Sequence, residues 1–287
     1  MAGSRVARHC SRVGRYPAAM PPGPPDPRAS TVIVAVGDEL LGGFTLDTNS
    51  HWLAQQVREA GWPVRRIEVV ADRDEDIVAA IHRAVADAWR VFVCGGVGPT
   101  TDDRTLAAVS HALGRPIVED PEALAHIQGI VARMRAAGWV ETTEVSAPNM
   151  RMAQVPAGAV VLRNRRGMAS GLAYPVGQPE AGEDRWLFVT PGIPREMQAI
   201  VAEEILPRWF AGGSAPTVRQ LDYAFAIEAQ FFKPMQVLEE EFPDVSVGSY
   251  PQTETRRLVI RLSGADASRV EAAVARLLEM RPLPPAD

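Results

Sequence analysis

The chain has 287 residues, of which 46% are hydrophobic and 23% are charged, and its formal net charge is −5. No apolar run approaches the roughly 18 residues of a membrane-spanning helix, and the negative charge argues against nucleic acid as a partner, because nucleic-acid-binding surfaces normally carry clustered basic residues. Length and composition therefore predict one large globular domain with a smaller companion, and neither a membrane nor a nucleic acid as partner.

The first thirty residues differ in composition from the rest of the chain. They contain several arginines, a single acidic residue and a proline-rich run. We expect a disordered leader over residues 1–30, with Met20 as an alternative start of the protein. The two cysteines, Cys10 and Cys94, show neither disulfide nor metal-site spacing, so a cytoplasmic location is expected.

Apolar runs alternate with helical patterns between residues 31 and 210. Buried strands are predicted at residues 31–36, 64–70, 91–94, 159–162 and 186–189. Helices are predicted at residues 49–60, 105–113, 121–137 and 194–209, with a further one that begins near Asp72 or Asp74. Continuous apolar strands between amphipathic helices predict a doubly wound α/β domain, in which helices cover both faces of a parallel sheet.

The pattern changes after residue 210. A run of small residues at 211–217 predicts a linker between two domains. Beyond it, strands are predicted at residues 218–227, 245–250 and 257–262, and helices at residues 234–242 and 267–280. Residues 218–281 are therefore expected to form a small α+β domain.

The sharpest functional signal is the glycine-rich segment at residues 95–103, between a predicted strand and a predicted helix. Glycines allow backbone amides to approach an anion, and the amino end of a helix adds partial positive charge. The expected phosphate donors are the amides of Gly95, Gly96 and Gly98 and the hydroxyls of Thr100 and Thr101. The segment has neither the lysine of a Walker A motif nor the spacing of a dinucleotide fingerprint.

Two adjacent carboxylates, Asp102 and Asp103, follow these glycines and would repel a bare phosphate. They make chemical sense if a divalent metal ion lies between them and the ligand, or if one of them is a base that orients a nucleophile. The alternative is that one aspartate caps the helix predicted from Thr105. We expect Asp102 and Asp103 to bind the metal.

Further polar and glycine-rich loops follow other predicted strands, where ligands bind in open α/β sheets. The expected ligand-binding residues there are Gly37, Asp38, Glu39, Gly167, Ser170, Gly171, Pro191 and Gly192. Asp72 also follows a strand, but it could equally cap the next helix, and Asp47 is expected to be a cap. Glu196 could complement the dipole of the helix that it opens. The histidines show no metal-site spacing.

Taken together, these motifs resemble the MoaB/Mog-like molybdopterin-binding domain, in the variant found in the competence/damage-inducible protein CinA and in bifunctional FAD synthases. Five motifs occur in the family's order, at residues 37–41, 47–50, 95–103, 164–171 and 191–196, and residues 248–251 resemble the small domain that follows. The resemblance implies a three-layer α/β/α domain, often oligomeric, that binds a pterin or a nucleotide at the strand ends. We therefore expect a small-molecule ligand and a homo-oligomer.

The resemblance also implies roles for individual residues. In the related molybdopterin adenylyltransferases two aspartates are catalytic, and by motif they correspond to Asp72 and Asp103 here. The domain type implies a nucleotide pyrophosphatase that uses magnesium or cobalt and acts on ADP-ribose or an FAD-like dinucleotide. Two alternatives stay open: a protein that binds or adenylylates molybdopterin, and a nucleotide-binding module without catalytic activity.

Overall fold

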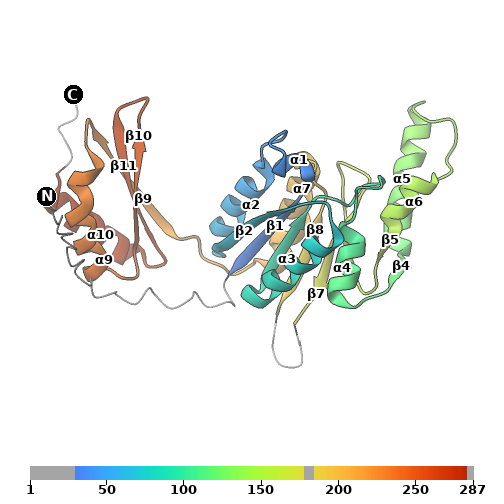
Figure 1. Ribbon diagram of the computed structural model, residues 1–287, viewed down its shortest axis with the longest axis horizontal. Coiled ribbons are helices and arrows are strands. Elements are labelled where there is room, and N and C mark those ends of the chain that lie inside the picture. Colours follow the sequence, from blue (N-terminus) through green and yellow to red (C-terminus); the bar gives the residue numbers. More distant parts are fainter. Residues whose placement is uncertain (1–29, 178–183, 283–287) are drawn as a thin grey trace, which may run out of the picture.

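A computed structural model describes residues 30–177 and 184–282, so the predicted leader, apart from Ser30, and Cys10 lie outside the described residues. The described chain forms one region around a six-stranded sheet and a second around a three-stranded sheet, joined through residues 211–216 (Figure 1). Within these residues no helix is long and apolar enough to cross a membrane.

The six-stranded sheet is mostly parallel. In order across the sheet, its strands are β2 (Val64–Val70), β1 (Thr31–Val36), β3 (Arg90–Cys94), β8 (Trp186–Thr190), β7 (Gly171–Pro175) and β6 (Val160–Leu162). The first four run parallel, whereas β7 is antiparallel to both of its neighbours. Every residue of β1 and β3 is buried, as expected for apolar strands that are covered on both faces.

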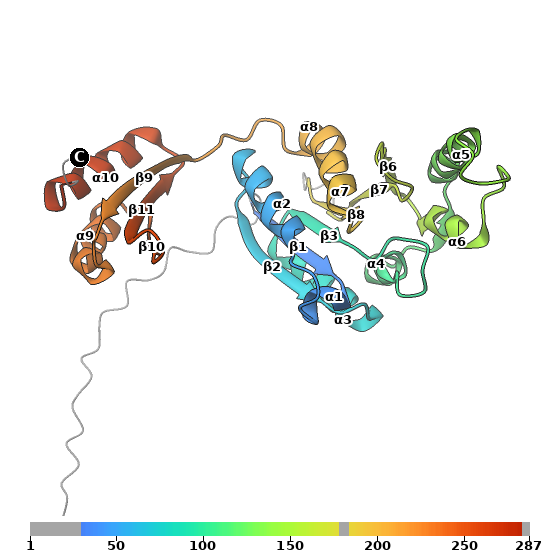
Figure 2. The ribbon, with the colours of Figure 1, turned by 90° about the horizontal axis from the view of Figure 1, so that it is seen from above.

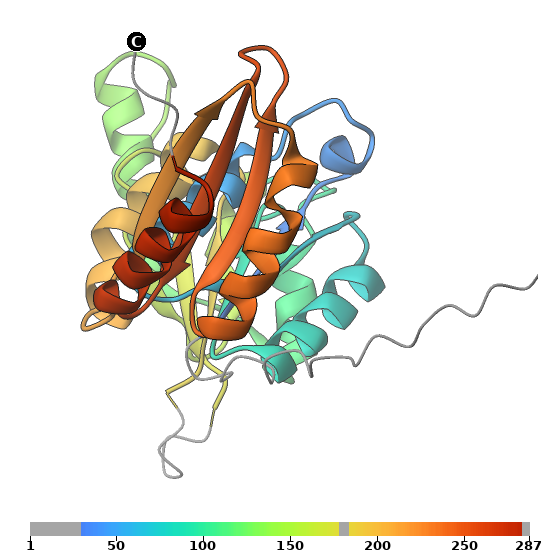
Figure 3. The same ribbon diagram turned by 90° about the vertical axis from the view of Figure 1, so that its left-hand side faces the viewer.

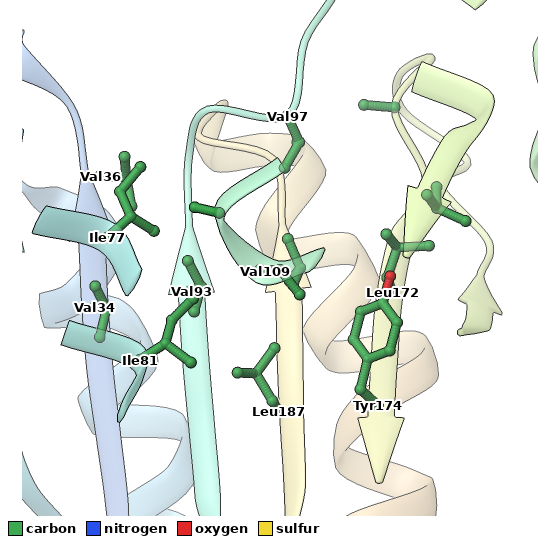
Figure 4. Packing of buried hydrophobic residues seen from close by; sticks show 14 of the residues in the cluster. Val34, Val36, Ile77, Ile81, Val93, Val97, Val109, Leu172, Tyr174 and Leu187 are labelled. Carbon is green, nitrogen blue, oxygen red and sulfur yellow. The ribbon is translucent and has the colours of Figure 1, made fainter. Parts of the chain in front are cut away.

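Helices lie on both sides of this sheet (Figure 2). One face packs against α3 (Asp74–Asp87) and α4 (Thr105–Leu113), and the other against α2 (Thr48–Glu59) and α7 (Pro194–Ile200). The first of these layers includes Val34, Ile77, Ile81, Val93 and Val109 (Figure 4). The predicted α/β architecture is confirmed.

The helix expected at residues 194–209 is continuous but not uniform. It consists of α7, a π-helical stretch (Val201–Ile205) and α8 (Leu206–Trp209). Pro207 has no N–H to donate to the carbonyl of Glu203, four residues earlier, so the regular ladder is interrupted there.

Between α4 and β6 the chain makes an excursion away from the sheet. Its elements are β4 (Ile117–Glu119), α5 (Pro121–Ala136), α6 (Ala147–Met150), a 3₁₀ turn (Arg151–Ala153) and β5 (Gln154–Pro156). β4 and β5 pair with each other in antiparallel fashion. Sequence predicted only α5 in this excursion, because the other elements have three or four residues and no measurable periodicity.

The second region is a three-stranded antiparallel sheet with two helices. Its strands, in order, are β10 (Ser246–Gln252), β11 (Arg257–Gly264) and β9 (Thr217–Ala224), and its helices are α9 (Phe232–Glu241) and α10 (Ala267–Met280), with a 3₁₀ turn (Glu228–Phe231) before α9. Figure 3 shows both helices in front of the sheet. Leu238, Leu262 and Leu277 are buried between these layers. The predicted small α+β region is therefore confirmed.

Of the capping interpretations, one is confirmed and the others are wrong. Asp47 accepts a hydrogen bond from the backbone N–H of Ser50 and so caps α2. The N-cap positions of α3 and α4 are Arg73 and Arg104, and neither provides a side-chain cap. Asp72 and Asp103 are bonded elsewhere, in the site described next.

Candidate functional site

A cavity of about 570 Å³ opens where the parallel strands end. Its volume lies in the range of small-molecule binding sites. Ten of the residues singled out from sequence line it: Gly37, Glu39, Asp72, Gly95, Gly96, Gly98, Asp102, Asp103, Pro191 and Gly192. The fold thus brings together loops that follow β1, β2, β3 and β8, because parallel strands end at the same edge of a sheet.

Six expected ligand-binding residues do not line this cavity: Asp38, Thr100, Thr101, Gly167, Ser170 and Gly171. Asp38 and Thr100 instead donate hydrogen bonds to Asp72 and Asp103. Gly171 begins β7, where an added Cβ would lie 2.7 Å from a methyl carbon of Ile200. A glycine is therefore needed at this position so that β7 can pack against Ile200.

Other lining residues had not been expected to bind ligand, among them Asn149, Met152, Met168, Ile193 and Glu196. Asn149 and Met152 belong to the excursion between α4 and β6, which carries no recognisable motif. Met168 and Glu196 lie within motifs that sequence had singled out, but nothing in their spacing showed that their side chains face the cavity.

Asp103 holds the glycine loop together. Its Oδ1 accepts a hydrogen bond from the backbone N–H of Gly98 at 2.7 Å, and its Oδ2 accepts from the N–H and hydroxyl of Thr100 at 2.8 and 2.5 Å. The N–H of Gly95 donates to the carbonyl of Thr190 at 3.0 Å. Two of the three amides expected to bind phosphate, those of Gly95 and Gly98, are therefore already bonded within the protein.

Gly95 is also required for the close approach of two strands. Its φ is +106°, a value that other residues rarely adopt. An added Cβ would lie 2.4 Å from the carbonyl oxygen of Val36. The loop after β3 consequently sits directly against the end of β1.

Asp72 is held beside this loop. Its Oδ2 accepts a hydrogen bond from the backbone N–H of Asp38 at 2.9 Å, at the start of α1 (Asp38–Leu41). Burial raises the pKa of Asp72, the hydrogen bond from Asp38 lowers it, and the charges of Asp38, Glu39 and Asp102 raise it further. The net shift is upward, which makes Asp72 a better proton acceptor than an exposed aspartate.

Asp102, like Glu39, is an exposed carboxylate of the site. The neighbouring hydroxyl of Thr100 is the main cause of its lowered pKa, so Asp102 stays charged at neutral pH. The cavity is therefore lined by one carboxylate with a raised pKa, that of Asp72, and one with a lowered pKa, that of Asp102.

The cavity wall is acidic without basic compensation. Among the described residues that line it there are five carboxylates, Glu39, Asp72, Asp102, Asp103 and Glu196, and neither arginine nor lysine. Two arginines of neighbouring segments are engaged within the protein: Arg104 pairs with Asp74, and Arg151 donates to the carbonyl of Thr100. An anionic ligand would meet net negative charge here.

A cluster of carboxylates of this kind suits a cation that is shared with the ligand. In the described part of the chain, no three His, Cys, Asp or Glu side chains are grouped as a preformed metal cage requires. Magnesium commonly uses one or two carboxylates together with phosphate oxygens of the substrate. The donor set therefore fits a metal–nucleotide complex, in which the charges that raise the pKa of Asp72 would be offset.

Glu196 also lines the cavity, and the buried side chain of Asn164 holds it in place. Glu196 is 5% exposed and accepts a hydrogen bond from Nδ2 of Asn164 at 2.8 Å, and the same nitrogen donates to the carbonyl of Ala169. Oδ1 of Asn164 accepts from the backbone N–H groups of Arg166 and Gly167. These bonds fix the shape of the loop at residues 164–171.

Comparison with known proteins identifies the region around the larger sheet. The family model described as "Probable molybdopterin binding domain" matches residues 32–211. The chain belongs to this molybdopterin-binding family. A second model, described as "FAD synthase, middle domain", matches residues 219–284. The resemblance inferred from the five motifs and from the small domain is confirmed.

Individual relatives align with different shares of this chain. A Pyrococcus furiosus protein is 34% identical over 245 residues, which make up 84% of this chain and 93% of the relative. A CinA-like protein of Gemmatimonas aurantiaca is 38% identical over 175 residues, 61% of this chain and only 38% of that protein. The crystal structure of the protein CinA "with unknown function" from Thermoplasma acidophilum aligns with a TM-score of 0.54 at 28% identity, over 62% of this chain and 96% of that one.

Proposed function

We propose that this protein hydrolyses the diphosphate linkage of a nucleotide such as ADP-ribose or an FAD-like dinucleotide, with magnesium or cobalt as the required cation. The observation that carries the proposal is the acidic cavity wall without arginine or lysine among its described residues. A diphosphate carries negative charge and would be repelled by this wall unless a divalent cation enters with it.

Asp102 and Asp72 are the residues assigned to hold the cation. Asp102 is exposed and charged, and the charge of Asp102 acts on Asp72. The sequence had given this role to Asp102 and Asp103, but both oxygens of Asp103 already accept hydrogen bonds from their own loop. Asp103 is therefore assigned to positioning, because it places Thr100 beside Asp102. A bound cation would polarise the phosphoryl group and acidify a water molecule.

Asp72 is also the candidate base. Its carboxylate would accept the proton from a water molecule that attacks phosphorus. The hydrogen bond from the N–H of Asp38 fixes one carboxylate oxygen, and an added Cβ on Gly96 would lie 3.5 Å from the other. The carboxylate is thus held against the glycine loop.

An apolar surface accompanies the acidic one. Met152, Met168 and Ile193 line the same cavity. Methionine and isoleucine side chains suit the flat face of an adenine or flavin ring. A ligand with a ring at one end and a diphosphate at the other matches both surfaces.

The same surfaces also suit a pterin that carries phosphate, and the description of the matching family favours this as the second candidate. In that case the cavity would bind molybdopterin and the cation would serve binding or adenylylation. Hydrolysis of ADP-ribose or FAD distinguishes the two functions, because only the first one predicts it.

The test is hydrolysis of ADP-ribose and FAD by the full chain with magnesium or cobalt, compared with EDTA. We expect Asp102→Asn and Asp72→Asn each to lower kcat at least a hundredfold, while Thr101→Ala, an exposed neighbour in the same loop, keeps the wild-type rate. Asp103→Ala should also lose turnover, because it removes the hydrogen bonds that fix the shape of the glycine loop.

Wild-type rates in both Asp102→Asn and Asp72→Asn would overturn the assignment. An absence of hydrolysis by the wild-type protein, together with tight molybdopterin binding, would move the protein to cofactor biosynthesis.

A further inference from the structure

A second cavity of about 180 Å³ lies behind the loop at residues 164–171. It is lined by Glu122 and His126 of α5, by Val161 of the edge strand β6, and by Arg163 and Ser170 from the segment between β6 and β7. The two cavities share none of these residues. Within the loop, Met168 and Ala169 line the first cavity and Ser170 lines the second.

Ser170 is the first sign that this cavity is a binding site. Ser170 is 7% exposed, and its hydroxyl oxygen has no hydrogen-bond partner among the described residues. Buried polar groups in folded proteins nearly always have such a partner. A buried hydroxyl that lines a cavity without one is free to bond to a polar atom that enters the cavity, from a ligand or from water.

Two nitrogen-bearing side chains share the cavity with this hydroxyl. Arg163 is exposed at the cavity and forms neither an ion pair nor a hydrogen bond with any described residue, and guanidinium groups bind oxyanions strongly. The ring of His126 is held by its Nε2, which lies 3.2 Å from the carbonyl oxygen of Gly167. Because a carbonyl only accepts, Nε2 carries a proton.

Glu122 restricts the kind of anion that fits. Its carboxylate lines the same cavity but forms no ion pair with Arg163. It would repel a divalent anion and would accept a hydrogen bond from a hydroxyl group. Liquid water occupies about 30 Å³ per molecule, so the cavity has room for an ion of a few heavy atoms with some water.

We propose that this second cavity binds a small monovalent oxyanion that carries a hydroxyl group. The negative oxygens face Arg163 and Ser170, and the hydroxyl donates to Glu122. Dihydrogen phosphate is the simplest ion with this chemistry, and this proposal does not depend on the function assigned to the first cavity.

The test is calorimetric titration of the full chain with inorganic phosphate in EDTA, at a pH below the second pKa of phosphate. EDTA removes the cation on which anion binding in the first cavity depends. We expect saturable binding that falls at least tenfold in Arg163→Gln and several-fold in Ser170→Ala. Arg166→Gln is the matched control, because Arg166 is exposed in the same loop and lines neither cavity.

Sulfate tests the role of Glu122, because it has the shape of phosphate without a hydroxyl group. Wild-type protein should bind sulfate several-fold more weakly than dihydrogen phosphate, and Glu122→Gln should remove that preference. Ser170→Ala should leave the melting temperature unchanged, since the hydroxyl that it removes has no partner in the described part of the chain.

The proposal is overturned if wild-type protein shows no saturable phosphate binding, or if Arg163→Gln and Ser170→Ala bind as the wild type does. It is equally overturned if Arg166→Gln weakens binding as much as Arg163→Gln.

Discussion

The two ends of strand β3 show how one element serves stability at its start and the proposed chemistry at its finish. At the start, Arg90 is 2% exposed and stacks over the ring of Trp62 at 4.4 Å. Its guanidinium donates to the carbonyl of Trp209 at 3.1 Å and to the carboxylate of Asp184 at 2.6 Å. At the finish, Gly95 opens into the acidic cavity.

The difference between these ends lies in how charge is satisfied. Arg90 has its partners within the protein, and its burial therefore contributes to a rigid closure of the sheet. At the other end, Asp72 and Asp102 line a cavity wall without a cationic partner among its described residues. Charge that a protein leaves uncompensated in a cavity is a mark of a ligand site.

The largest expected effect is at the start of the strand. Arg90→Ala should lower the free energy of unfolding by about 3 kcal/mol, because it removes several buried hydrogen bonds and leaves space between aromatic rings. Urea unfolding measures this. Arg208→Ala is the control: Arg208 is half-exposed and pairs with Glu204 one helical turn away, so the change should stay within about 0.5 kcal/mol. A similar loss in both variants would contradict the distinction.

At the other end, Gly95→Ala should cost about 2–3 kcal/mol, from the positive φ and from the clash with the carbonyl of Val36. Gly129→Ala is a matched control inside α5, where an added Cβ meets nothing closer than 3.8 Å. It should raise the free energy of unfolding by about 0.5–1 kcal/mol. Equal effects in the two glycine variants would mean that the loop after β3 tolerates a side chain.

The smallest expected effect is a gain in stability at the proposed active site. Because the pKa of Asp72 is raised in the folded protein, its ionisation destabilises the fold, and this penalty grows as the pH rises from the ordinary aspartate pKa through the raised one. Asp72→Asn should therefore raise the melting temperature by about 1–2 °C at neutral pH, and by nothing in acid below about pH 3.5.

Asp76→Asn serves as the control for Asp72→Asn. Asp76 is exposed in the first turn of α3 and lies 4.0 Å from Arg73, so its charge favours the helix dipole. Thermal melts across pH should show a small loss for this variant where Asp72→Asn shows a gain. A loss for both at neutral pH would contradict the repulsion that we assign to the carboxylates around Asp72.

Most of the fold could be predicted from the sequence because its signals are local. The bounds of β1, β2, α4 and α10 agree with the expected ranges, since a buried strand or an amphipathic helix has its own periodicity. Arg90 shows where prediction from local sequence fails. The strand had been expected to begin one residue later, because charged residues are seldom buried and the aromatic rings that cover Arg90 come from distant segments.

The candidate site was predictable as a set of loops but not as a set of contacts. Motif order placed Asp72 and Asp102 at the strand ends, which the fold brings together. Sequence could not show that Asp103 turns back onto Gly98, or that Ser170 faces the second cavity, because the direction of a side chain in a loop depends on the turn that holds it.

The central claim is that the first cavity accepts an anionic nucleotide only together with a divalent cation. Its most direct test is calorimetric titration of the wild-type chain with ADP-ribose, first in EDTA and then with magnesium in excess, at a temperature where turnover is slow. We predict saturable binding with magnesium and at least a hundredfold weaker binding in EDTA. Equally tight binding in EDTA would contradict it.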